Sequence, residues 1–390
     1  MSLQIAIVGL PNVGKSTLFN ALVRGSHAEA ANYPFCTIEP NVGVVEVPDE
    51  RLKPLAEVSK SKKIVPTVIE FVDVAGLVKG ANKGEGLGNQ FLSHIRECDA
   101  IALVVRFFED PNIVYVGGQP SADHPQGEKI DPKSDIETIE TELQLADIST
   151  VEKRLFSVEK ELKANSKEAK ILHEGLQKIK NVLYDGKNAR LAELSDDEDL
   201  ALKGLSLLTM KPILYIANCS EEQLAEISNN KFLIPNEMSN EVPTKQGLSG
   251  SRSKGIGTSF IPISAKIESE LNELNDEEKA EYLETLGIKQ SGLSRLINEA
   301  YKTLGLITYF TSGEPETRAW TVYNGAKAPE AAGVIHTDFE RGFIAADVIG
   351  WLDLVNQGGW SAARAKGLVR TEGKNYTFQD GDVTLFKFNV

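Results

Sequence analysis

The chain has 390 residues, which is long for one domain and fits about two or three domains of ordinary size. With 41% hydrophobic and 25% charged residues it can bury a large core, and its net charge of −14 argues against a general nucleic-acid-binding surface. The scattered Cys36, Cys98 and Cys219 exclude a disulfide framework, and neither a leader peptide nor an apolar stretch of about 18 residues is visible. We therefore expect a cytoplasmic protein with no membrane and no DNA partner, although a local basic patch is still allowed.

Short apolar runs alternate with helical patterns over much of the chain. The first run ends at Gly9, as a buried parallel strand does at a tight turn. The expected strands are Leu3–Val8, Val42–Val47, Thr67–Asp73, Ala100–Arg106, Ile213–Asn218 and Phe260–Ile263. This alternation predicts an α/β fold with a doubly wound sheet.

The alternation stops between about Pro132 and Lys203, where the sequence is charged, poor in glycine and helical in pattern. Apolar residues there step by three and four in two stripes, namely Ile148, Val151, Leu155, Val158, Leu162 and then Leu172, Leu176, Ile179, Leu183. The stripes predict an antiparallel helical hairpin, a coiled coil inserted into the α/β domain; two ordinary surface helices on the sheet are the alternative. Acidic Ser195–Asp199 lacks calcium-loop spacing and is expected to be a solvated turn or helix start.

From Leu306 the pattern changes again. Strands are expected at Trp320–Tyr323, Phe343–Val348 and Val383–Phe388, and a short alanine-rich helix near Trp360–Lys366. Residues 306–390 therefore read as a separate small α+β domain.

The segment Gly9-Leu-Pro-Asn-Val-Gly14-Lys15-Ser16-Thr17 matches the phosphate-binding loop pattern GxxxxGK(S/T) between a strand and a helix. Its glycines let backbone N–H groups close around phosphates, Lys15 reaches the β- and γ-phosphates, and the Ser16 hydroxyl ligates Mg²⁺. The predicted nucleotide-binding residues here are Asn12, Val13, Gly14, Lys15, Ser16 and Thr17. Asn12 can also ligate a monovalent cation such as K⁺, although a hydrogen bond within the loop is the commoner role of such a residue.

Two further segments have the order and spacing of a phosphate-sensing site. The strand ending at Asp73 delivers Asp73-Val-Ala-Gly76, in which Asp73 would hold Mg²⁺ and the Gly76 amide would sense the γ-phosphate. Thr37, in the loop before the second strand, is a candidate second hydroxyl ligand of Mg²⁺; a threonine that caps a turn is the alternative. We assign Ser16, Thr37 and Asp73 to the metal, and Lys15, Thr37 and Gly76 to catalysis.

The residue after this motif is Leu77, where Ras-type enzymes have a glutamine that orients water. An aliphatic side chain cannot do this, so intrinsic hydrolysis should be slow. Of the nearby histidines, His94 is expected to be structural, and His124 is a weak candidate for the missing group. The five glycines from Gly76 to Gly88 suit a loop that orders with nucleotide.

The strand ending at Asn218 carries Asn218-Cys219-Ser-Glu221, which is NxxE where GTPases have the base-reading NKxD motif. Later, Ser264-Ala265-Lys resembles the loop that contacts the base from the other side. We assign Asn218, Cys219, Glu221, Ser264 and Ala265 to the base site. The order of these motifs is that of the GTPase class of P-loop proteins.

Taken together, these segments resemble the YchF / Obg-like ATPase family. The resemblance rests on Gly9–Thr17, 32–41, Asp73–Gly88, Asn218–Glu221, Gly333–Asp347 and the ending from Gly381 to Val390, and covers essentially the whole chain. It implies a P-loop nucleotide-binding domain (1–132 and 204–305), an inserted coiled-coil domain (133–203) and a C-terminal TGS domain of β-grasp shape (306–390). It also implies ATP preferred over GTP, slow hydrolysis with Mg²⁺, and association with ribosomes.

Several features differ from the family pattern or remain open. Where the family usually carries a histidine implicated in hydrolysis, this chain has Tyr115. The C-terminal domain is slightly acidic overall, yet it holds a local basic cluster flanked by aromatic residues, namely Arg364, Lys366, Arg370 and Lys374 beside Trp360 and Tyr376. Such a cluster suits ribosomal RNA, and an ordinary solvated face is an equal alternative. A true GTPase of the Obg type and a nucleotide-binding scaffold without turnover are the competing functions.

Overall fold

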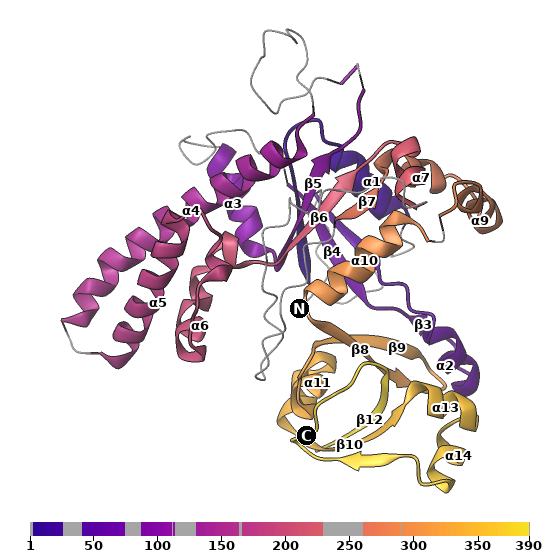
Figure 1. Ribbon diagram of the computed structural model, residues 1–390. Helices are drawn as coiled ribbons and strands as arrows, with labels where there is room; N and C mark the ends of the chain where they lie inside the picture. The colour runs from indigo at the N-terminus through magenta and orange to yellow at the C-terminus, as the bar shows by residue number, and fades with distance from the viewer. Residues whose placement is uncertain are drawn as a thin grey trace.

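The structure is a computed structural model that describes residues 3–25, 41–74, 87–110, 112–113, 130–163, 166–228, 260–288 and 290–389 (Figure 1). Its first sheet has the strand order β2-β4-β1-β5-β6-β7. These strands are β1 (Gln4–Val8), β2 (Val42–Glu46), β4 (Val68–Asp73), β5 (Ala100–Arg106), β6 (Ile213–Asn218) and β7 (Ile261–Ile263). Only β2 runs antiparallel to its neighbour. The predicted doubly wound α/β sheet is confirmed.

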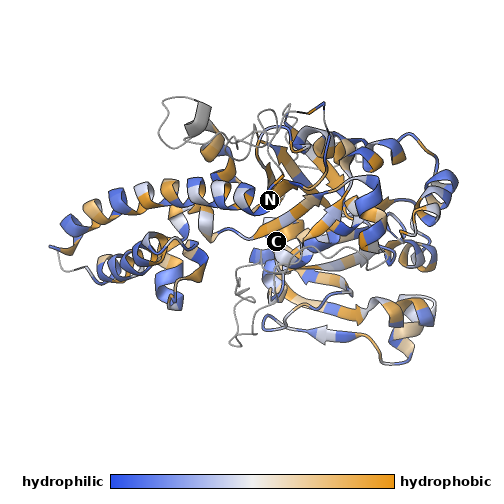
Figure 2. Ribbon diagram, turned by 45° about the horizontal axis from the view of Figure 1, so that its top comes forward, coloured by the Kyte–Doolittle hydropathy of each residue, from blue (hydrophilic) through white to orange (hydrophobic). Residues whose placement is uncertain are grey.

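Helices cover this sheet and complete its core. The helices of this domain are α1 (Lys15–Gly25), α3 (Leu87–Glu97), α7 (Glu221–Ser228), α8 (Ala265–Leu271), α9 (Asp276–Thr285) and α10 (Gly292–Thr303). The apolar faces of α1, α3 and α10 pack on strands such as β5, whose residues are all buried, whereas α9 packs with α7 and α8 in a separate small cluster. Figure 2 shows this distribution, with the hydrophobic residues gathered on the strands. Because the parallel strands point the same way, the segments that follow Val8, Asp73, Asn218 and Ile263 meet at one edge of the sheet.

The inserted segment is a helical hairpin that projects from the α/β core as an arm (Figure 1). It contains α4 (Pro132–Leu162), α5 (Lys167–Tyr184) and α6 (Asp196–Leu202), with the short helices η2 (Ala189–Leu191), η3 (Lys203–Leu205) and η4 (Leu208–Met210). Nearly all residues of the two predicted stripes form its own small core, from Ile148 to Leu183. The first half of α4, including Ile136 and Leu143, instead packs on the core of the sheet. The hairpin is therefore confirmed, and α4 is rooted in the nucleotide-binding domain.

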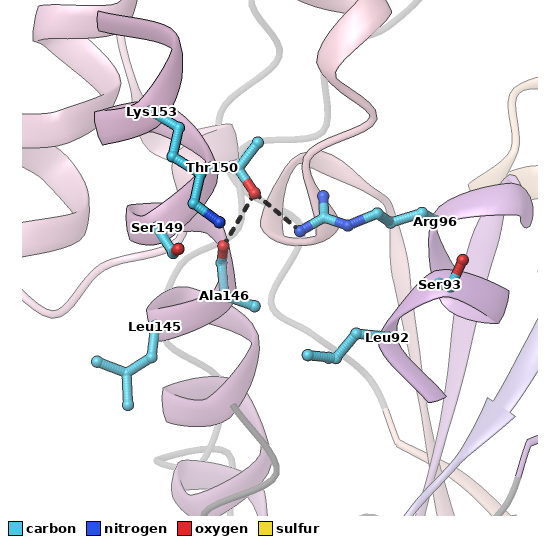
Figure 3. Close-up of a pocket in the computed structure, with 8 residues that line it drawn as sticks. All are labelled: Leu92, Ser93, Arg96, Leu145, Ala146, Ser149, Thr150 and Lys153. Atoms are coloured by element: carbon cyan, nitrogen blue, oxygen red, sulfur yellow. Dashed lines mark hydrogen bonds between the residues drawn. The ribbon is translucent and has the colours of Figure 1, made fainter. Parts of the chain in front are cut away.

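A polar groove of about 270 Å³ marks the place where the arm meets α3 (Figure 3). Arg96 on α3 donates to the Thr150 hydroxyl on α4 at 3.0 Å and to the Ser206 carbonyl at 3.1 Å. Thr150 in turn donates to the Ala146 carbonyl at 3.0 Å. This network fastens the arm to the helix that follows the glycine-rich loop.

The C-terminal domain is a mixed sheet with helices packed on it. Its elements are β8 (Leu306–Ser312), β9 (Thr317–Tyr323), α11 (Ala328–Ile335), α12 (Thr337–Arg341), β10 (Phe343–Gly350), α13 (Trp351–Gln357), α14 (Trp360–Ala365), β11 (Arg370–Glu372) and β12 (Asp382–Phe388). The strand order is β11-β10-β12-β8-β9-β3, with β12 parallel to β8. The predicted α+β domain is confirmed, while β8 and β11 were not among the expected strands.

A segment from the N-terminal part of the chain completes this second sheet. The strand β3 (Ile64–Val65) pairs in parallel with β9, and the helix α2 (Leu52–Ser59) lies beside α13 (Figure 1). Leu52 and Leu55 are buried in a cluster with Phe310 and Val383 of the C-terminal domain. The predicted division placed this segment in the nucleotide-binding domain, and the structure instead packs it in the C-terminal one. An amphipathic helix gives no sign of which sheet it will cover, so sequence alone could not assign it.

Polar contacts reinforce this joint between the domains. Arg51 pairs with Asp380 at 2.6 Å and lies 4.9 Å from the centre of the Phe310 ring. The Ser61 hydroxyl donates to the Gly313 carbonyl at 2.7 Å. Within the described ranges, no helix has both the length and the apolar character that crossing a bilayer requires.

Candidate nucleotide-binding site

The phosphate-binding loop lies between β1 and α1, where its backbone geometry requires glycine. Gly14 has φ +93°, and a Cβ there would lie 2.3 Å from the Asn218 amide nitrogen. A Cβ on Gly9 would lie 2.6 Å from the Val104 carbonyl oxygen. Asn12 also has a positive φ of 62°, a conformation that asparagine tolerates better than most residues. Both glycines are thus needed for the close approach of this loop to β5 and β6.

Lys15 opens α1 and points back into the loop. Its ammonium donates to the Leu10 carbonyl at 2.7 Å, and the residue is only 7% exposed. Burial lowers the pKa of Lys15, and the nearby Asp73 carboxylate opposes that shift. The charged group of Lys15 is therefore held in a mostly buried position within the phosphate-binding loop.

Ser16 and Asp73 come together from α1 and the end of β4. The Ser16 hydroxyl donates to Asp73 Oδ2 at 3.0 Å, while Asp73 Oδ1 is buried and has no hydrogen-bond partner among the described residues. Burial raises the pKa of Asp73, and the Ser16 hydrogen bond and Lys15 act against this rise. A buried carboxylate oxygen without a partner, beside a hydroxyl, is the donor set that a hard divalent cation such as Mg²⁺ prefers. The residues present therefore fit the metal.

Asn218 joins three segments at the base side of the site. Its Nδ2 donates to the Val13 carbonyl at 2.9 Å, and its Oδ1 accepts from the Ala265 N–H at 3.0 Å. Ser264 caps α8 by accepting from the Ile267 N–H at 3.4 Å. The Asn218 amide keeps one further N–H and one further lone pair with which to contact a base. The structure thus brings the phosphate loop, the NxxE segment and the Ser264–Ala265 segment together.

The two other members of the NxxE segment have different environments. Cys219 is 2% exposed and packs in the core of the sheet, where burial raises the pKa of its thiol to about 12. Glu221 is exposed in the first turn of α7. Burial raises the pKa of the Tyr282 phenol on α9, and the nearby negative charge of Glu221 raises it further.

Other predicted residues lie elsewhere or outside the described part of the chain. Thr37, Gly76, Leu77, Tyr115 and His124 all fall outside the described residues. His94 is exposed on α3, so its imidazole does not have the core packing expected of a structural histidine.

Sequence reasoning missed Gln223 and Phe107 beside the NxxE segment. The Gln223 amide donates to the Phe107 carbonyl at 2.9 Å, and its oxygen accepts from the Ser220 N–H at 2.9 Å. The spacing Ser220-x-x-Gln223 is that of a capping box, which was the available signal for Gln223. The contact with Phe107 joins residues far apart in the chain, and no local sequence signal indicates it.

The basic cluster of the C-terminal domain is exposed and partly neutralised. Arg364 pairs with Asp347 at 3.3 Å and lies 5.7 Å from the Trp360 ring centre. Arg370 lies 5.5 Å from the Tyr376 ring centre and 3.9 Å from Asp382. The structure thus places the predicted arginines over aromatic rings, next to acidic residues.

Comparisons with known proteins agree with these observations. A family model described as a 50S ribosome-binding GTPase matches residues 4–144, and the model of the YchF GTPase C-terminal region, described as a protein of unknown function (DUF933), matches residues 306–389. Relatives named ribosome-binding ATPase YchF are 52% identical in Bacillus subtilis and 50% identical in Haemophilus influenzae, each over 100% of both chains. The solved structure of the Schizosaccharomyces pombe YchF GTPase has a TM-score of 0.80 at 37% identity and covers 99% of this chain and 98% of its own.

Proposed function

This chain belongs to the YchF family, and from that premise we propose that it is a slow ATPase that binds ATP with Mg²⁺ and associates with ribosomes in the cytoplasm. The observation that carries the proposal is the juxtaposition of Lys15, the Ser16–Asp73 pair and Asn218 at one edge of the sheet. The residues expected to contact the phosphates, the metal and the base therefore converge at one edge of the sheet.

The residues of the chain have distinct roles in this proposal. Lys15 exchanges the Leu10 carbonyl for β- and γ-phosphate oxygens, so its charge is already desolvated before the nucleotide arrives. Ser16 and Asp73 hold Mg²⁺, which offsets phosphate charge when it is bound. Thr37 adds a second hydroxyl ligand and the Gly76 amide senses the γ-phosphate. Asn12 is the candidate ligand for K⁺.

Adenine should be preferred to guanine. A short aspartate in NKxD proteins accepts two hydrogen bonds from guanine, and Glu221 is one methylene longer and exposed. Leaving guanine donors without a partner costs about 1–3 kcal/mol, or roughly 5- to 150-fold in affinity. Competition between ATP and GTP on one preparation measures this ratio. Guanine preferred by tenfold would support the alternative of a true GTPase of the Obg type.

A double substitution makes the base preference a test of the residues themselves. Cys219→Lys with Glu221→Asp restores the NKxD pattern and should move the ratio towards GTP. Because Cys219 is buried in the core, the single Glu221→Asp variant serves as a control that leaves the core intact. An unchanged ratio in both variants would show that this segment does not read the base.

The scaffold alternative predicts binding without turnover. Leu77 and Tyr115 favour it, because Leu77 cannot orient water and Tyr115 stands where the family usually has a histidine implicated in hydrolysis. Multiple-turnover kinetics with Mg²⁺ and K⁺, with and without ribosomes, separate the two functions. We expect slow but repeated turnover, and a single turnover or none would favour the scaffold.

The basic cluster should contribute to ribosomal RNA binding. Reversing the charges of Arg364, Lys366 and Arg370 should weaken cosedimentation with ribosomes and leave ATP affinity unchanged. It should also reduce the slope of log affinity against log salt by about 2–3, because each phosphate contact releases counterions. Lys302→Glu on α10, a side chain 71% exposed, is the matched control. Equal sedimentation of the triple variant and wild type across the salt series would reject this surface.

A further inference from the structure

The turn between β6 and α7, which carries Glu221, is fixed at its helical end by a reciprocal pair of contacts. The Ser220 N–H donates to Gln223 Oε1 at 2.9 Å, and the Gln223 N–H donates to the Ser220 hydroxyl at 3.3 Å. This capping arrangement defines the first turn of α7. These contacts hold Glu221 against its own helix, and a separate contact is needed to hold the turn against the sheet.

The NH2 end of the same Gln223 side-chain amide supplies that connection. Its Nε2 donates to the Phe107 carbonyl at 2.9 Å, while the Phe107 N–H donates to the Asn218 carbonyl at 2.9 Å. Phe107, the residue that follows β5, is thus bound at its N–H by Asn218 of the NxxE segment and at its carbonyl by Gln223, two residues after that segment. The Phe107 ring packs edge-on against Phe260 at 5.6 Å, and Phe260 leads directly into β7 and Ser264. Phe107 therefore contacts both the NxxE segment and the segment that leads to Ser264.

We propose that Gln223 is a positioning residue for base recognition, which sets the NxxE turn against the end of β5 so that Glu221 and Asn218 face the adenine together. The inference rests on the proposed function. Its physical basis is that Glu221 is exposed, so the position of its carboxylate follows from the turn that carries it. A side-chain amide can serve as acceptor for the turn and donor to the sheet at once, which few other side chains can do.

Gln223→Glu separates positioning from helix capping. The glutamate keeps an acceptor for the Ser220 N–H, loses the donor to Phe107, and places a carboxylate against its carbonyl. Ser220→Ala does the reverse, since it weakens the cap and retains the Phe107 contact. Glu226→Gln, exposed on the same helix, is the control for a change of charge on α7.

The experiment titrates wild type and these variants with ATP, GTP and inorganic tripolyphosphate in the presence of Mg²⁺. For Gln223→Glu we expect ATP affinity to fall about 3- to 30-fold and the ATP-to-GTP affinity ratio to fall at least about threefold. Tripolyphosphate affinity should stay within about twofold, because the phosphate loop is not touched. Ser220→Ala should lower the melting temperature and leave the ratio unchanged.

Two results would overturn the inference. One is an equal loss of affinity for all three ligands in Gln223→Glu, which indicates a general structural effect. The other is ATP affinity and an ATP-to-GTP ratio that match those of Glu226→Gln. If wild type itself binds ATP no more tightly than tripolyphosphate, the base contributes nothing, and both the proposed base site and the positioning role are refuted.

Discussion

Replacing Lys15 with alanine is expected to lower ATP affinity at least about 100-fold while the fold is retained. Hydrogen bonds to charged groups contribute about 1.5–3 kcal/mol each, and Lys15 can make two to the phosphates, which sums to ~3–6 kcal/mol. In the part of the chain that the structure describes, its ammonium donates to the Leu10 carbonyl of the loop and lies near Asp73. Removal of a partly desolvated charge therefore costs the protein little stability. Equilibrium titration with ATP gives the affinity, and circular dichroism reports the fold.

Lys15→Met is the matched control because it fills the same buried space without the charge. Both variants should lose nucleotide in the same way, which separates the loss of the charge from the loss of packing. If either variant binds ATP within a few-fold of wild type and keeps its circular-dichroism spectrum, the phosphate-loop assignment is wrong.

Leu55→Ala should destabilise the C-terminal domain by about 2–5 kcal/mol, although Leu55 lies 251 residues before that domain begins at Leu306. Leu55 is 0% exposed in the cluster with Phe310, Leu354 and Val383. The three tryptophans of the chain, Trp320, Trp351 and Trp360, all lie in this domain. Tryptophan fluorescence in urea thus follows its unfolding directly. With a slope of about 1–2 kcal/mol/M, the midpoint should fall by at least about 1 M.

Lys53→Ala is the control, because Lys53 is exposed on the same helix and is also replaced by alanine. Its midpoint should match that of wild type. If Leu55→Ala unfolds together with Lys53→Ala, then α2 does not belong to the core of the C-terminal domain in solution.

Local signals explain why so much of the nucleotide site could be read from the sequence. The phosphate loop, the carboxylate at the end of β4 and the NxxE segment are short motifs that follow predicted strands. The geometry of a parallel sheet brings such strand ends together. The acidic stretch from Ser195 was likewise expected as a turn or helix start, and Ser195 and Glu198 form the capping box of α6. In each case the chemistry and the structural cue lie within a few residues.

Contacts between distant segments could not be read in the same way. The pairing of β3 with β9 and the contact of Gln223 with Phe107 both depend on partners far away in the chain. Cys219 shows the same limit, since the motif places it beside the base while the packing turns its side chain into the core. A pattern of residue types defines which side chains are near a site, and the tertiary packing decides which of them face it.

We propose that this chain is an adenine-nucleotide switch that responds to ribosomes. The most direct test measures equilibrium affinities for ATP, ADP, GTP and GDP with and without ribosomal subunits. We expect ATP to bind more tightly than GTP, and ribosomal subunits to change the ratio of ATP to ADP affinity, because coupling between two ligands is reciprocal. GTP bound tenfold more tightly than ATP, or affinities that ribosomal subunits leave unchanged, would contradict it.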